Sequence, residues 1–98
     1  MNVQAMMKQA QKLQKDMMVA KDEIDNTLFE GESSIVKVKM NGKKQLLQTK
    51  IDSNDLSLDD IEILEDMIVI AVNDALKKID TKTNEKMGKY TQGMPGLF

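Results

Sequence analysis

Residues 36–42 read Val-Lys-Val-Lys-Met-Asn-Gly, and this stretch decides how the rest of the chain can be arranged. Apolar and charged residues alternate from Val36 to Met40, which is the period of a strand with one buried face. Asn41-Gly42 then favours a two-residue type I′ turn, because both central positions of that turn need positive φ. We therefore expect a β-hairpin in which residues 43–51 return along the first strand.

Pairing across such a turn sets Lys39 beside Lys44 and Lys37 beside Leu46. One face of the sheet is then expected to carry four lysines and no acid: Lys37, Lys39, Lys44 and Lys50. Like charges placed opposite each other cost stability, so this face would favour an anionic neighbour. Residues 27–33, just upstream, predict a third and weaker strand that can lie at the edge of the sheet.

Residues 2–25 predict a long helix with an apolar seam. No Gly or Pro interrupts them, and apolar residues recur at alternating spacings of three and four. The seam consists of Val3, Met6, Ala10, Leu13, Met17, Ala20 and Ile24. A helix of ~24 residues is roughly 36 Å long, whereas a compact fold of this size is about 30 Å across. We therefore expect this helix to project beyond its own domain, with Lys8, Lys12 and Lys15 opposite the seam.

Residues 57–87 predict a second long helix. Ser57 is the expected N-cap, and acids follow in the first turn, where they complement the helix dipole. The buried stripe is expected to comprise Leu58, Ile61, Leu64, Ile68, Ala71, Ala75 and Ile79. Gly88 is the expected stop, with an irregular tail over residues 88–98. The fold class is thus α+β: a single domain over 1–98, with a helix at 2–25, about three antiparallel strands within 27–51 and a helix at 57–87.

Composition excludes most chemistry. The 98 residues include no Cys and no His, which removes disulfides, zinc fingers, thiol catalysis and Ser-His arrangements. No Gly-rich phosphate loop is present. We expect no enzyme activity, no catalytic residues, no metal, no cofactor and no small-molecule substrate. No apolar run approaches ~18 residues, so we expect no membrane segment and a cytoplasmic location.

The charges are grouped by sign, although the net charge is only −2. Residues 1–15 hold three lysines and no acid, and residues 35–51 hold five lysines and no acid. Residues 52–66 hold seven acids and no lysine. Such blocks become charged patches if folding places them on one face, although they can also be ordinary solvated faces. Every basic residue is Lys, a point charge that suits phosphate, whereas reading a guanine edge favours the Arg fork.

Four segments in order carry a resemblance to a known family. They are residues 7–14 (Met-Lys-Gln-Ala-Gln-Lys-Leu-Gln), residues 36–42, residues 64–69 with Asn73-Asp74-Ala75, and Met87-Gly88-Lys89 followed by Thr91, Gly93, Met94, Pro95, Gly96 and Leu97. Over nearly its whole length the chain resembles the YbaB/EbfC family of bacterial nucleoid-associated proteins. It departs from the family at residues 27–34, where the family often runs Glu-Gly-x-x-Gly-Gly-Gly and this chain has only Gly31.

The resemblance implies two long helices around about three strands, a homodimer, binding to double-stranded DNA, and a role in nucleoid organisation or gene regulation. The projecting helix and the small, aromatic-poor core also favour an obligate homodimer, intertwined or face to face. For DNA contact we predict Lys8, Lys12, Lys15, Lys82, Lys86 and Lys89, with the sheet lysines as the runner-up. The alternative function is a protein-interaction scaffold that recruits replication or recombination partners.

Overall fold

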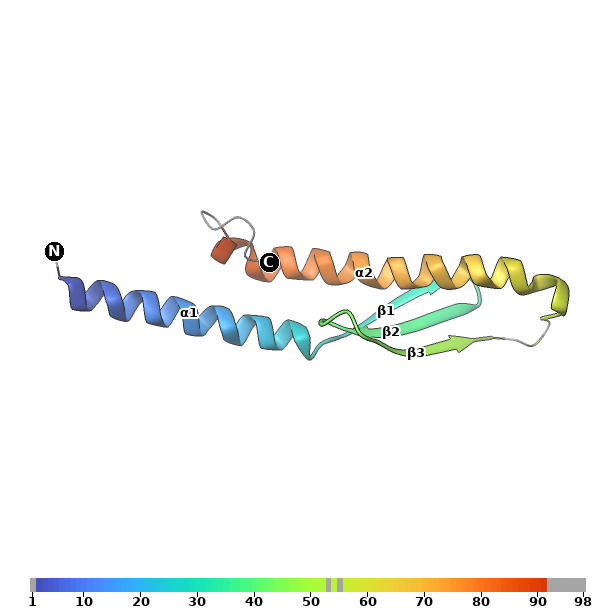
Figure 1. Ribbon diagram of the computed structural model, residues 1–98, viewed down its shortest axis with the longest axis horizontal. Helices are drawn as coiled ribbons and strands as arrows, with labels where there is room; N and C mark the ends of the chain where they lie inside the picture. The colour runs from blue at the N-terminus through green and yellow to red at the C-terminus, as the bar shows by residue number, and fades with distance from the viewer. Residues whose placement is uncertain (1, 53, 55, 92–98) are drawn as a thin grey trace.

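The computed structural model of the chain describes residues 2–52, 54 and 56–91. Its elements are α1 (Val3–Asp25), β1 (Leu28–Ser33), β2 (Val36–Asn41), β3 (Leu46–Ile51), a 3-10 turn η1 (Leu58–Asp60) and α2 (Ile61–Thr91). The predicted order of a helix, a small antiparallel sheet and a second helix is confirmed. Figure 1 shows α2 lying over the sheet and continuing beside the end of α1, in a molecule measuring 71 × 21 × 15 Å.

The start of α1 projects past the rest of the fold, as its length predicts. Asn2 caps the helix, and its side-chain oxygen accepts hydrogen bonds from the N–H groups of Gln4 and Ala5 at 3.1 and 3.3 Å. Ile24, at the far end of the seam, is buried, whereas Val3, Met6 and Leu13 are at least half exposed. Only the C-terminal end of α1 therefore packs against the body (Figure 1).

The core lies between α2 and one face of the sheet. The strand order is β1-β2-β3, so the predicted third strand is confirmed as the edge strand β1. Val36 and Val38 from β2 pack with Ala71 and Ala75 from α2, and all four are at most 1% exposed. A Cβ at Gly31 would collide with the carbonyl oxygen of Ala71 and lie 2.6 Å from the nitrogen of Ala75. Gly31 therefore permits the close approach of β1 and α2 that forms this core.

The hairpin turn differs from the predicted type I′ turn. The N–H of Lys44 donates to the carbonyl of Asn41 at 3.0 Å, and the N–H of Asn41 donates to the carbonyl of Gln45 at 3.1 Å. The positive φ belongs to Lys44, at 66°, so the turn is longer than two residues. Gly42 has another reason to be glycine: a Cβ there would collide with the carbonyl of Ile24 at the end of α1.

The longer turn changes the register, so the predicted pairs of Lys39 with Lys44 and Lys37 with Leu46 are wrong. Lys37 is opposite Lys50 instead, and Lys39 is opposite Gln48. On the other side β1 sets Glu32 opposite Lys37 and Glu30 opposite Lys39. The outer face of the sheet is therefore not free of acid. Lys44 leaves this face altogether, because its ammonium lies 3.4 Å from the Asp80 carboxylate on α2.

Both ends of the second helix can be compared with their predictions. Ser57 caps the 3-10 turn η1 instead of α2, which begins at Ile61, and the Asp60 carboxylate accepts a hydrogen bond from the N–H of Ser57 at 3.0 Å. The predicted stop at Gly88 is wrong, because α2 continues to Thr91. A helical glycine costs about 1 kcal/mol relative to alanine, and the packed side chains of Met87 and Tyr90 hold the helix on either side of it. Residues 92–98 of the predicted tail lie outside the described residues.

Residues predicted for the buried stripe of α2 divide along the helix. Ala71, Ala75 and Ile79 are buried, and Leu64 and Ile68 are partly buried. Leu58 and Ile61, however, are 85% and 47% exposed. The sheet is shorter than α2, so the first turns of the helix extend past it (Figure 1).

Candidate nucleic-acid interface

Lys8, Lys12 and Lys15 lie on one face of the projecting part of α1. At 100° per residue they span an arc of about 60°, and all three are exposed. Within the described part of the chain none of them forms an ion pair. Their positive charge is therefore available to a ligand.

Lys82, Lys86 and Lys89 lie on one face of the last turns of α2, and they are more engaged than the first group. The Lys86 ammonium pairs with the Glu23 carboxylate of α1 at 3.2 Å and so links the two helices. The Lys89 ammonium lies 5.0 Å from the centre of the Tyr90 ring. Lys82 is half-buried beside a hollow of about 410 Å³. Part of the charge of this group is thus balanced within the chain.

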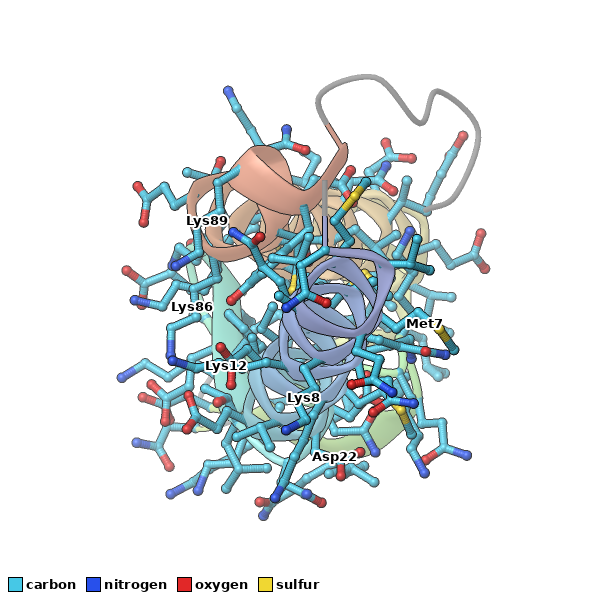
Figure 2. The ribbon with its side chains drawn as sticks, turned by 90° about the vertical axis from the view of Figure 1, so that its left-hand side faces the viewer. Met7, Lys8, Lys12, Asp22, Lys86 and Lys89 are labelled. Atoms are coloured by element: carbon cyan, nitrogen blue, oxygen red, sulfur yellow. The ribbon has the colours of Figure 1, made fainter. Side chains whose placement is uncertain are left out.

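The two groups are aligned along the molecule. Figure 2, viewed along the long axis, shows Lys12, Lys86 and Lys89 on the same side, with Lys8 below them. Met7 lies on the opposite side of α1. A polyanion running along the lysine side can therefore contact both helices, and lysine is suited to phosphate as a point charge.

The β1 edge of the sheet is fixed by two charged side chains of α2. The N–H of Glu32 donates to the Asp74 carboxylate at 3.1 Å, and the Lys78 ammonium donates to the carbonyl of Glu30 at 2.8 Å. The backbone hydrogen bond from Glu32, followed by the nearby Lys78 ammonium, lowers the pKa of Asp74 below 3.8, while partial desolvation opposes the shift. Asp74 is therefore ionised at neutral pH, and it is part of the fold.

The sheet lysines form a weaker anion site than their sequence pattern suggests. Lys37 and Lys39 of β2 each lie opposite a glutamate of β1, and Lys44 forms an ion pair with Asp80. Neighbouring opposite charges reduce the local positive potential. Acids therefore lie beside Lys37, Lys39 and Lys44, which lowers the positive charge of this face.

Comparison with known proteins identifies the protein family of this chain. The model of the YbaB/EbfC DNA-binding family matches residues 1–94. The chain belongs to this family. Nucleoid-associated proteins of Ligilactobacillus salivarius and Lactococcus lactis subsp. cremoris are 46% and 47% identical to it, and the matches cover 99% and 97% of this chain and 95% and 98% of those proteins.

A solved structure supports the same fold. The crystal structure of an uncharacterized protein from Helicobacter pylori is 22% identical, with a TM-score of 0.70 over 94% of this chain and 97% of that one. Within residues 2–52, 54 and 56–91 of this YbaB/EbfC chain, no helix is long and apolar enough to cross a membrane.

Sequence reasoning missed two side chains that shape the lysine surface of this YbaB/EbfC protein. Lys78 stands four residues before Lys82 and could have been placed beside it from helical spacing alone. Its hydrogen bond to the carbonyl of Glu30, by contrast, has no signal in the sequence. The same holds for Glu23, whose partner Lys86 is 63 residues away along the chain.

Proposed function

We propose that this chain binds double-stranded DNA as a homodimer, mainly through contacts between lysines and phosphates. The proposed contact residues are Lys8, Lys12 and Lys15 of α1 with Lys82, Lys86 and Lys89 of α2. The proposed role is nucleoid organisation or gene regulation in the cytoplasm, in keeping with the nucleoid-associated relatives. The observation that best supports the proposal is the lysine face of α1, which lies on a helical segment that packs little against its own chain.

A net charge of −2 is compatible with this proposal because the largest acidic block, at residues 52–66, is remote from the lysines of α1 (Figure 1). The acids of η1 and of the first turns of α2, from Asp59 to Asp66, lie at the opposite end of the molecule from the lysines of α1 (Figure 1). Charges separated by more than a Debye length of about 8 Å are largely screened at physiological salt. The lysine face can therefore attract DNA locally.

The absence of Arg bears on how the DNA is read. A lysine contacting a guanine edge gives less geometric selectivity than the bidentate Arg fork. We expect modest sequence discrimination, and a preference above roughly a thousandfold for one site would contradict a phosphate-led mechanism.

Replacing Lys8, Lys12 and Lys15 together by Glu tests the proposed contact. DNA binding in a gel-shift titration should be abolished, while circular dichroism and the sedimentation mass should match those of the unaltered protein. A matched control changes Lys37, Lys39 and Lys50 to Glu, which alters the net charge equally and should leave most of the affinity. Unchanged affinity in the α1 variant would move the site to the sheet lysines.

A second candidate function, recruitment of replication or recombination proteins, is supported by a different surface. Leu58 of η1 and Ile61 and Ile63 of α2 are exposed among acids, and exposed apolar side chains with polar rims mark protein interfaces. The salt dependence of binding affinity distinguishes the two candidate functions, since phosphate contacts release counterions and apolar contacts with a protein partner largely do not.

A further inference from the structure

Glu23 and Lys86 form an ion pair between α1 and α2 on the lysine side of the molecule. The Glu23 carboxylate accepts a hydrogen bond from the Lys86 ammonium at 3.2 Å. Both side chains are open to solvent, with 60% of Glu23 and 36% of Lys86 exposed. A carboxylate oxygen meets an ammonium much as a phosphate oxygen does, through a charge-assisted hydrogen bond. Glu23 therefore fills a position on Lys86 that a phosphate would otherwise take.

The place of Glu23 along α1 explains why it meets the lysines of α2. Glu23 follows Lys12 by eleven residues, so at 100° per residue the two side chains leave the helix within about 20° of each other. Figure 2 shows Lys12 and Lys86 on the same side of the molecule. Glu23 thus adds a negative charge where the lysine face of α1 reaches the lysines of α2. A phosphate backbone that runs along this side passes close to the carboxylate.

The Glu23 side chain is not what holds the two helices together. Its neighbour Ile24 and the neighbour of Lys86, Met87, are buried and belong to the hydrophobic core. The Thr27 hydroxyl donates to the main-chain carbonyl of Glu23 at 2.6 Å, and any side chain at position 23 preserves this bond. An exposed ion pair changes an equilibrium constant by a factor of up to about five. The carboxylate can therefore be removed without dismantling the contact between the helices.

The lysines of α1 are in a different position from Lys86. Within the described part of the chain, Lys8, Lys12 and Lys15 form no ion pair. A phosphate can bind to them without displacing a side chain. At Lys86, by contrast, an incoming phosphate meets a cation that already has an anionic partner.

We infer that Glu23 competes with DNA phosphate for Lys86 and so limits the affinity of this chain for DNA. The inference rests on the proposed function, because it needs Lys86 to contact phosphate. Two effects act in the same direction. A phosphate must displace Glu23 to reach the Lys86 ammonium, and the displaced carboxylate then repels that phosphate from close range. In the proposed homodimer both effects occur twice.

Glu23→Gln tests the inference, because it removes the charge and keeps the shape of the side chain. The affinity of this variant for a duplex of random sequence, measured by fluorescence anisotropy at low salt, should be about three to ten times that of the unaltered protein. Circular dichroism and the sedimentation mass should not change.

Asp22→Asn is the matched control, since it changes the net charge equally and lies one residue away. Figure 2 shows Asp22 below Lys8, away from Lys86. Its charge is therefore more strongly screened from the Lys86 ammonium, and the control should gain less than about twofold in affinity. A gain in the control as large as that of Glu23→Gln would overturn the inference.

A double-mutant cycle shows whether the gain acts through Lys86. In a Lys86→Gln background, Glu23→Gln should raise the affinity by less than about twofold, because no ammonium is left for the carboxylate to occupy. An equal gain with and without Lys86 would overturn the inference, since Glu23 would then act only through general repulsion.

Two further failures can be told apart. If the unaltered protein binds DNA and Glu23→Gln binds it no better, the competition is overturned and the proposed function remains. If the folded, unaltered protein does not bind DNA, the proposed function is overturned and this inference with it.

Discussion

The first half of α1 and residues 71–87 of α2 are both regular helix, yet they differ in how much of their surface is buried. Ala71, Ala75, Ile79 and Met87 of α2 are at most 1% exposed. Over residues 3–16 of α1, every side chain is exposed. The free energy of folding is therefore concentrated where α2 meets the sheet and the end of α1. The lysines of α1 lie on a segment that packs little against its own chain, so we expect their replacement to change the stability of the chain little.

The largest effect is expected where α2 touches β1. Gly31→Ala places a Cβ against the backbone of Ala71 and Ala75, so two packed backbones must move apart. We expect a loss of about 3 kcal/mol or more in the free energy of unfolding, measured in urea. Gly88→Ala is the matched control: outside the neighbouring backbone of its own helix, no atom of the described residues lies within 4 Å of its added Cβ, and alanine should add up to ~1 kcal/mol. Equal stability of Gly31→Ala and the unaltered protein would contradict the packed contact.

A comparison of two large-to-small substitutions separates the regions more finely. Met87→Ala empties a site that is 1% exposed and should cost about 2–5 kcal/mol. Leu13→Ala removes a side chain that is 54% exposed, so its cost should stay within about 0.5 kcal/mol. Chemical denaturation of both variants gives the two values. A cost for Leu13→Ala as large as that for Met87→Ala would mean that the α1 seam is buried in the assembled protein.

The same division explains what the sequence could predict. α1 follows from a local signal, an uninterrupted helical period, and its lysine face is read from the same period. The strand at Val36 follows from alternation. The turn and the register do not, because Gly42 is selected by a contact with Ile24 that no local pattern contains. Gly88 misleads for a related reason, since distant packing of Met87 continues the helix.

The site divides in the same way. The three lysines of α1 could be grouped from spacing alone, as could those at the end of α2. The partial neutralisation of Lys86 by Glu23 could not, because it depends on how the two helices meet in space. The acids opposite Lys37 and Lys39 likewise depend on the alignment of β1 with β2.

The smallest effect concerns Asp74, which ties α2 to β1 through its charge. A carboxyl whose pKa is lowered by folding stabilises the fold above its ordinary pKa of 3.8, and this contribution is lost as the pH falls through the lowered value. The melting temperature of Asp74→Asn at pH 7 should therefore be lower than that of the unaltered protein. The difference between the two melting temperatures should narrow as the pH falls below 3.8, in thermal melts followed by circular dichroism. A difference in melting temperature that widens in acid would contradict the stabilising role of the Asp74 carboxylate.

The salt dependence of DNA affinity tests most directly whether the unpacked lysines of α1 hold phosphates. For about six neutralised phosphates, the slope of log affinity against log salt should be near −5, at ~0.9 per phosphate. Replacing Lys8, Lys12 and Lys15 by Gln should make the slope shallower by about 0.9 for each phosphate that is no longer neutralised. The same slope in the variant and the unaltered protein would contradict the account, because the phosphates would then be held elsewhere.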